Sequence, residues 1–116
     1  MPQRPTGAES RRDRTARGTD ATTVISLLDD DDARQILTAL AEPQTAQEIM
    51  ADCDIPRSTA YRKLDELADA GLVEERIRPS ATGNHASEYA RAFDDVRIHI
   101  TGDREYEVAI QPRTRR

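Results

Sequence analysis

The sequence has few of the residues from which metal and catalytic sites are commonly built. Cys53 is the only cysteine among the 116 residues, so an intrachain disulfide is impossible and a cysteine-based metal site is not expected. The two histidines, His85 and His99, have no ligand partner near them in the sequence. Nucleophile–base pairs and phosphate-binding glycine loops are also missing. We therefore expect no enzyme, no metal and no cofactor, and the sequence identifies no small-molecule substrate.

Long hydrophobic runs are missing as well. No apolar stretch approaches the roughly 20 residues that cross a bilayer, and residues 1–19 carry arginines without an apolar segment. These features predict a cytoplasmic protein that neither spans a membrane nor carries a signal peptide. Hydrophobic residues make up 36% of the chain and aromatic residues 3%, which predicts a small aliphatic core. Dimerisation would stabilise such a small domain by burying more apolar surface.

Lysine is almost absent, and the charges are unevenly distributed. Lys63 is the only lysine, against sixteen arginines and thirteen aspartates, a bias typical of salt-adapted organisms with GC-rich genomes. The net charge is −5, and residues 29–56 carry eight acids against the single cation Arg34. Residues 57–63 carry three cations and no acid. This separation is typical of an acidic protein with a basic surface that faces nucleic acid.

The apolar pattern divides the chain into four parts. Residues 1–20 lack apolar periodicity and are predicted to be a disordered basic tail. Residues 21–93 are predicted to form the folded domain, and residues 94–111 a β-hairpin extension. Residues 112–116 have the composition of a second basic tail.

Helix signals occupy the first half of the folded domain. A short helix is expected from about Val24, and four aspartates at 29–32 suit the start of a second helix with an apolar face. The segment 45–48, Thr-Ala-Gln-Glu, is a capping box that begins a short helix. The next helix is expected at about Pro56–Ala70, with Gly71 in its left-handed C-terminal cap.

Strand signals follow the helices. Residues 72–78 and 85–93 are predicted to pair around the polar turn 79–84, so that the last three helices precede a hairpin, the order of a winged helix. A second hairpin is expected around the loop 102–104. Its predicted pairs are Val96 with Ile110, Ile98 with Val108 and Ile100 with Tyr106. The pairing places all six apolar side chains on one face, which either extends the wing sheet or forms a dimer contact.

The helix at Pro56–Ala70 carries polar groups at its beginning. If Leu64 points inward, Arg62 points outward, where its guanidinium could bind guanine through two hydrogen bonds in the major groove. Hydroxyl groups of the same turn could bind phosphate or a base edge, and arginines of the wing could enter the minor groove. Tyr61 is interpreted either as a phosphate contact or as half-buried packing. The predicted DNA-binding residues are Arg57, Ser58, Thr59, Tyr61, Arg62, Lys63, Arg76, Arg78, Asn84 and His85.

Residues 55–73 also carry a resemblance to a known family. Their segments Ser-Thr-Ala-Tyr-Arg-Lys-Leu and Ala-Gly-Leu-Val resemble the recognition helix and first wing strand of ArsR-like winged helix-turn-helix transcriptional regulators. The span from about Leu27 to Phe93 is similar to the haloarchaeal type. The resemblance implies a homodimer on a partly palindromic site in double-stranded DNA, with half-sites roughly 34 Å apart. The thiolate clusters of metal-sensing members are missing here, and the last hairpin lies outside the common domain.

Together these observations predict an α+β fold: a winged helix-turn-helix, with a three-helix core and a β-wing hairpin, followed by an additional C-terminal β-hairpin. The predicted function is sequence-specific binding of double-stranded DNA in transcription regulation. A winged helix used for protein–protein contact is the alternative, but it would expose apolar groups where Arg57 and Arg62 stand. An RNA-binding version would need stacking aromatic residues, and Tyr61 is the only one nearby. Cys53 is interpreted as a core residue, with a redox role as the alternative.

Overall fold

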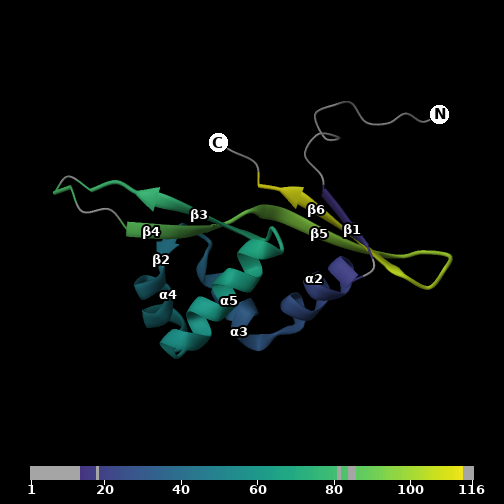
Figure 1. Cartoon of the computed structure of the whole chain (residues 1–116), viewed down its shortest axis with the longest axis horizontal. Coiled ribbons are helices and arrows are strands. Elements are labelled where there is room, and N and C mark those ends of the chain that lie inside the picture. The colour runs from purple at the N-terminus through teal and green to yellow at the C-terminus, as the bar shows by residue number, and fades with distance from the viewer. Residues whose placement is uncertain (1–13, 18, 81, 84–85, 114–116) are drawn as a thin grey trace.

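The computed structural model describes residues 14–17, 19–80, 82–83 and 86–113 of the chain. Helices pack along one side of two antiparallel three-stranded sheets, with strand orders β2-β4-β3 and β1-β6-β5 (Figure 1). The elements are β1 (Arg14–Arg17), α2 (Thr19–Asp29), α3 (Asp31–Ala39), β2 (Gln44–Thr45), α4 (Ala46–Cys53), α5 (Arg57–Asp69), β3 (Val73–Arg78), β4 (Ala86–Arg91), β5 (Phe93–Ile100) and β6 (Tyr106–Pro112). The predicted α+β class and the order of helices before hairpins are confirmed.

Side-chain caps fix where α3 and α4 begin. Asp30 is the N-cap of α3 and accepts a 2.9 Å hydrogen bond from the Ala33 N–H, which is the main reason that the pKa of Asp30 is lowered. At α4, the Glu48 N–H donates to Thr45 Oγ1 (3.2 Å) and the Thr45 N–H donates to Glu48 Oε1 (2.9 Å). Each cap satisfies backbone N–H groups that the first helical turn leaves without partners. The predicted capping box is therefore confirmed.

The boundaries of α5 follow from its two ends. Pro56 is the N-cap rather than the first helical residue, so the helix begins one residue later than expected. At the other end Gly71 adopts φ 81°, and the Leu72 N–H donates to the Leu67 carbonyl at 2.9 Å. This pattern is a Schellman cap, in which a glycine tolerates the left-handed conformation that stops the helix.

One continuous core joins the helices to both sheets. Its fully buried large side chains come from α3, α4, α5 and β6, with Leu40 and Leu72 just outside these elements. They are Ile36, Leu40, Ile49, Leu64, Leu67, Leu72 and Val108. Because Val108 and Ile110 belong to this cluster, the C-terminal hairpin is part of the domain and not a separate appendage.

The register of the C-terminal hairpin agrees with the prediction. Val96 pairs with Ile110, Ile98 with Val108 and Ile100 with Tyr106. The Thr101 N–H donates to the Glu105 carbonyl at 2.8 Å, which closes the expected loop 102–104. In the first hairpin, β3 pairs with β4 from Val73–Arg91 to Arg78–Ala86. Its second strand is shorter than the expected 85–93, because Phe93 already belongs to β5.

The prediction of a disordered tail over residues 1–20 is wrong in its last part. Residues 14–17 form β1, which pairs antiparallel with β6, and α2 begins at Thr19. Edge strands offer unpaired backbone groups, so a segment without apolar periodicity can still add to a sheet. Residues 1–13 and 18 lie outside the described part of the chain.

The predicted basic tail at 112–116 also begins later than expected. Pro112 is the last residue of β6, and the Arg113 N–H donates to the Ala92 carbonyl at 3.1 Å. The Arg113 guanidinium donates to the Ala41 carbonyl at 3.2 Å, which ties the end of β6 to the loop after α3. Residues 114–116 lie outside the described residues. Across the described ranges, no helix has the length and apolar content to cross a bilayer.

Candidate nucleic-acid interface

A three-residue turn joins α4 to α5 and sets the angle between them. Asp54 takes the left-handed conformation (φ 57°), and its N–H donates to the Met50 carbonyl at 3.0 Å. Ile55 is buried in the core, which anchors the turn, and Pro56 is the N-cap of α5. Ala60, Leu64 and Leu67 form the buried stripe of α5, so the opposite face of this helix lies at the surface.

The first two turns of α5 present cationic and hydroxyl groups to solvent. Arg57, Ser58 and Arg62 are exposed, and Thr59 is half-buried. The Arg57 guanidinium lies 5.2 Å from the centre of the Tyr61 ring, a cation–π distance. In the described part of the chain, no carboxylate forms an ion pair with Arg57 or Arg62. Both guanidinium groups are therefore available to an anionic partner.

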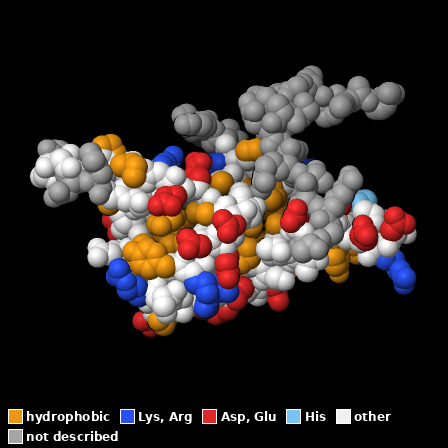
Figure 2. Space-filling model, viewed as in Figure 1, with side chains coloured by type: hydrophobic (Ala, Val, Ile, Leu, Met, Phe, Trp, Pro, Cys, Tyr) orange, Lys and Arg blue, Asp and Glu red, His pale blue; other side chains and the backbone are white. Residues whose placement is uncertain are grey.

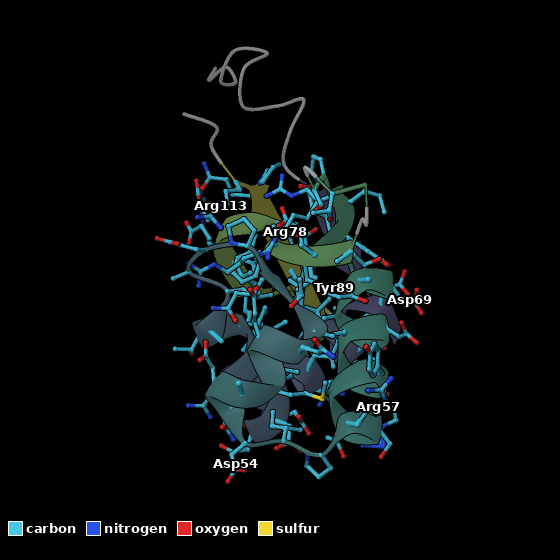
Figure 3. The ribbon with its side chains drawn as sticks, turned by 90° about the vertical axis from the view of Figure 1, so that its left-hand side faces the viewer. Asp54, Arg57, Asp69, Arg78, Tyr89 and Arg113 are labelled. Atoms are coloured by element: carbon cyan, nitrogen blue, oxygen red, sulfur yellow. The ribbon has the colours of Figure 1, made fainter. Side chains whose placement is uncertain are left out.

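The acids of α5 lie farther along the helix. Asp65 and Asp69 are exposed, and Figure 3 shows Arg57 and Asp69 at opposite ends of α5. Figure 2 shows two groups of basic side chains over the lower part of the helices, with acidic side chains beside and below them as well as nearer the sheets. A negatively charged ligand would accordingly be attracted to the beginning of the helix and repelled from its end.

Tyr61 lies on the flank of α5 that faces the hairpin β3–β4. Its side chain is 37% exposed. Together with Arg57, Gln47 and Tyr89 it lines a polar hollow between the start of α4, the start of α5 and the hairpin. Burial raises the pKa of Tyr89, the deeper of the two phenols. Because Tyr61 is partly packed and partly open, the structure is compatible with either interpretation of this residue.

Lys63 points toward the beginning of α3. Its ammonium lies 3.2 Å from Asp30 Oδ1 and 3.4 Å from Glu66 Oε1, and its side chain is only 14% exposed. Asp30 is the N-cap of α3, so Lys63 joins α5 to the beginning of that helix. The sequence predicts a phosphate contact for Lys63, and the structure instead places it in a partly buried ion-pair network.

The predicted wing arginines are also engaged by carboxylates. Arg76 Nε lies 3.3 Å from Glu88 Oε2, and Arg78 Nε donates to Glu88 Oε1 at 2.8 Å. Arg78 also donates from Nη2 and Nη1 to the two oxygens of Glu48, at 3.0 and 3.2 Å. These hydrogen bonds are the first cause of the low pKa of Glu48, about 2. Asn84 and His85 lie outside the described residues.

Glu48 and Glu88 are the residues of this region that sequence reasoning missed. The sequence pattern identifies Glu48 only as part of the capping box and does not indicate its pairing with Arg78. The signal for Glu88 is the hairpin register, because pairing Arg78 with Ala86 across the turn places Arg76 opposite Glu88. Fixing that register from the sequence would have revealed the cross-strand charge pair.

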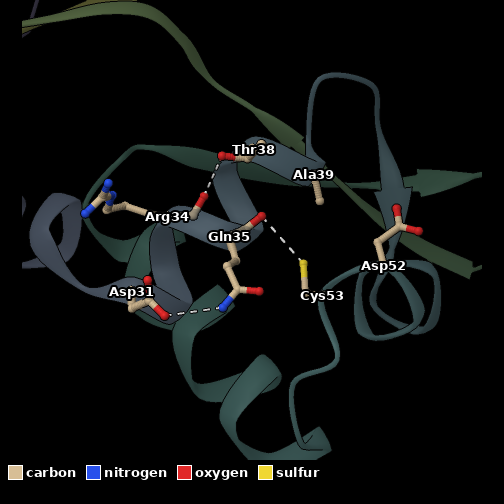
Figure 4. Close-up of a pocket in the computed structure, with 7 residues that line it drawn as sticks. All are labelled: Asp31, Arg34, Gln35, Thr38, Ala39, Asp52 and Cys53. Carbon is tan, nitrogen blue, oxygen red and sulfur yellow. Dashed lines mark hydrogen bonds between the residues drawn. The ribbon is translucent and has the colours of Figure 1, made fainter.

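A second hollow lies between α3 and α4 and includes Cys53 (Figure 4). The Cys53 thiol lies 3.5 Å from the Gln35 carbonyl, and the Gln35 amide donates to Asp31 at 3.5 Å. Burial raises the pKa of the Cys53 thiol, which disfavours the reactive thiolate and supports a core role. Among the residues that the structure describes, no group of three potential metal ligands gathers.

Comparison with protein families identifies the helices from which this surface is built. A family model described as a helix-turn-helix domain matches residues 28–76. The chain contains a helix-turn-helix domain. The match spans α3, α4, the turn and α5, and it extends into β3. No curated protein matches the chain. The helix-turn-helix with its hairpin wing and C-terminal hairpin establishes the fold class, and it indicates a DNA-binding regulator.

Proposed function

We propose that the chain is a sequence-specific regulator of transcription that binds double-stranded DNA through α5. On this proposal it is an ArsR-like winged helix-turn-helix regulator of the haloarchaeal type that acts in the cytoplasm as a homodimer. The observation that carries the proposal is the beginning of α5, where Arg57 and Arg62 are exposed and form no ion pair with a carboxylate of the described residues. Every other cation predicted to contact DNA, within the described ranges, is paired with acids.

In the proposed complex, α5 enters the major groove with its N-terminal end first. Arg62 binds guanine through two hydrogen bonds, a contact that discriminates between bases by roughly 1–3 kcal/mol. Arg57, Ser58 and Thr59 bind phosphate or base edges, with Tyr61 at the flank. Asp65 and Asp69 lie toward the end of the helix that leaves the groove. This polarity is that of a recognition helix whose early residues contact the bases.

The wing is proposed to approach the neighbouring minor groove. The hairpin β3–β4 lies beside the flank of α5 that carries Tyr61, so a duplex seated on α5 would pass close to the hairpin. Asn84 and His85, which follow β3 in the sequence and lie outside the described residues, are the sequence-predicted contacts at this position. Arg76 and Arg78 are also sequence-predicted contacts of the wing, and both guanidinium groups lie against carboxylates of the protein itself.

The proposed homodimer uses the outer half of the C-terminal hairpin. Ile98 is 50% exposed, Ile100 66% and Tyr106 47%, although the strand register places them on the face whose inner half is buried. Figure 2 shows hydrophobic side chains beneath this projecting end. A second copy related by a two-fold axis would cover the face with its own equivalent and extend the core across the interface. A two-fold dimer would also bring two α5 helices to a partly palindromic site.

A protein-contact module is the second candidate function, and α5 offers it little support. Tyr61 is the only exposed large hydrophobic residue of this helix, and a protein-binding helix would be expected to expose an apolar patch at its centre. The other exposed large hydrophobic residues in the described part of the chain lie on the two hairpins.

Selection of bound duplexes from a random-sequence pool, followed by gel-shift titration, tests the proposal. Wild-type protein is expected to recover a related set of sequences. Arg62→Ala should then weaken binding to the selected duplex about ten- to hundredfold and relax base preference at one position. Arg34→Ala, which removes an exposed arginine from α3, is the matched control and should leave affinity unchanged. Equal affinity of wild type and Arg62→Ala, or failure of the pool to yield any sequence preference, would contradict the proposal.

A further inference from the structure

The wing of this protein projects with little apolar support. In β3 only Val73 is buried, whereas Glu74, Glu75, Arg76 and Ile77 are exposed. The third strand of the sheet, β2, pairs with β4 only at Tyr89 and Glu88. Beyond those two residues the wing is a two-stranded ribbon, which is marginally stable without packing on another element. Something other than core packing must therefore hold the far half of β3 in place.

Arg78, the last residue of β3, supplies such a tie. Its guanidinium donates two hydrogen bonds to Glu48 on α4, at 3.0 and 3.2 Å, and one to Glu88 on β4, at 2.8 Å. Planar two-oxygen pairing of this kind fixes the orientation of the partners as well as their distance. Glu48 is itself held by the capping box with Thr45. A connected series of hydrogen bonds thus runs from the first turn of α4 to both strands of the wing.

The charge of this network argues against direct contact between Arg78 and DNA. Arg76 and Arg78 are two cations, and they share three carboxylates, Glu48, Glu74 and Glu88. The group therefore carries a net charge of about −1. A phosphate bound by Arg78 would have to displace two carboxylates or lie beside them, and either arrangement is unfavourable.

We propose that Arg78 is a positioning residue of the DNA-binding surface: it clamps the wing to α4 through Glu48 and Glu88 and does not itself bind phosphate. The inference rests on the proposed DNA-binding function, and it names what sets the distance between wing and recognition helix. Arg57 would neutralise phosphate and Arg62 would bind guanine, whereas Arg78 would determine how the wing meets the same duplex. Glu48 acts in the same clamp and also caps α4.

The salt dependence of DNA binding separates a positioning residue from a phosphate contact. Each neutralised phosphate adds about 0.9 to the magnitude of the slope of log affinity against log salt concentration. With a duplex recovered from the random pool, Arg78→Gln is expected to lower affinity roughly three- to tenfold at an unchanged slope, a loss of the size expected when a charge network is broken. Arg57→Gln is the control and should reduce the slope by about 0.9. A slope reduced by about 0.9 in Arg78→Gln, or an unchanged affinity, would overturn the proposal.

Glu48→Gln provides a matched variant in which the helix cap is preserved. A glutamine oxygen still accepts the Thr45 N–H, so α4 should remain folded while the charged pair with Arg78 is lost. The clamp predicts weaker binding at an unchanged slope. Tighter binding with a steeper slope would mean that Glu48 withholds Arg78 from phosphate, and it would contradict the positioning role.

A distance measurement on the protein alone tests the clamp independently of the proposed DNA binding. Spin labels at Thr82→Cys in the wing turn and Asp69→Cys at the end of α5, in a Cys53→Ala background, report the distance between wing and recognition helix. Arg78→Gln is expected to broaden that distance distribution, with circular dichroism confirming that both labelled proteins are folded. An unbroadened distribution would reject the clamp even if the protein binds DNA. If wild type selects no duplex but the distribution broadens, the proposed function fails and the clamp stands.

Discussion

The two hairpins of this chain have similar lengths but are held to the rest of the domain by different forces. The hairpin β5–β6 buries Val108 and Ile110 in the core, and β1 covers its outer edge along β6. The hairpin β3–β4 leaves Ile77 62% exposed and is held near its far end by Arg78 and its two carboxylates. Figure 1 shows the two hairpins projecting in opposite directions from the helices.

A small domain can thus use different forces for stability and for placement. Apolar burial is strong and non-directional, so it suits the hairpin that completes the core. Exposed ion pairs contribute little to stability but have defined geometry, so they suit a hairpin that must reach a ligand at a set position. Single substitutions can break one kind of attachment and leave the other intact.

The largest expected effect comes from the core of the C-terminal hairpin. Val108 is fully buried, and Val108→Ala should lower the free energy of unfolding by about 2–3 kcal/mol, through lost burial and the cavity that remains. Ile77→Ala, the matched change in the wing, should cost less than about 1 kcal/mol because its side chain is already mostly exposed. Urea denaturation of both variants measures the contrast. Similar losses in the two variants would show that the wing also depends on apolar packing.

An intermediate effect is expected at the outer half of the same hairpin. Replacing Ile98 and Ile100 by serine should weaken self-association at least tenfold, with little change in the unfolding of the dissociated chain, because the proposed interface loses two large apolar side chains. Light scattering over a concentration series measures the mass. The matched control is Ile77→Ser, which removes an equally exposed isoleucine from the wing and should leave the mass unchanged. A wild-type chain that stays monomeric at all concentrations would contradict the proposed homodimer.

The smallest effect concerns the ion pairs of the wing and depends on pH. The pKa of Glu48 is lowered from 4.5 to about 2, first by the hydrogen bond from Arg78. A lowered folded-state pKa means that the stabilisation is complete above about pH 4.5 and is lost as the pH falls toward 2. The stability difference between wild type and Glu48→Gln should therefore shrink over this window, as measured by urea denaturation at several pH values. The cost of Val108→Ala should not change with pH, and a constant difference for Glu48→Gln would contradict the assigned ion pair.

The parts of the fold that depend on local chemistry could be predicted from the sequence. The capping box at Thr45, the cap at Gly71 and the register of Val96 with Ile110 each follow from neighbouring residues or from a short loop. Strand β1 could not be predicted, because Arg14–Arg17 has no apolar pattern and joins the sheet through backbone pairing with β6.

Prediction of the candidate site was limited by long-range ion pairs. The exposed beginning of α5 follows from helical periodicity once Leu64 is placed inward, and Arg57 and Arg62 are exposed as expected. The partners of Lys63 and Arg78 depend on how distant segments pack, since Asp30 and Glu48 lie on other helices or at their caps. Residue type alone therefore identified cations but not which of them remain free to bind a ligand.

Binding through α5 is tested most directly by an NMR titration. The backbone amide signals of isotope-labelled wild-type protein are monitored while the selected duplex is added. The account predicts that the largest shifts fall on the amides of Arg57, Ser58, Thr59 and Arg62, with smaller shifts at the wing turn and none at the loop 102–104. Shifts concentrated on the C-terminal hairpin, with the beginning of α5 unperturbed, would contradict the claim that this helix is the DNA-binding element.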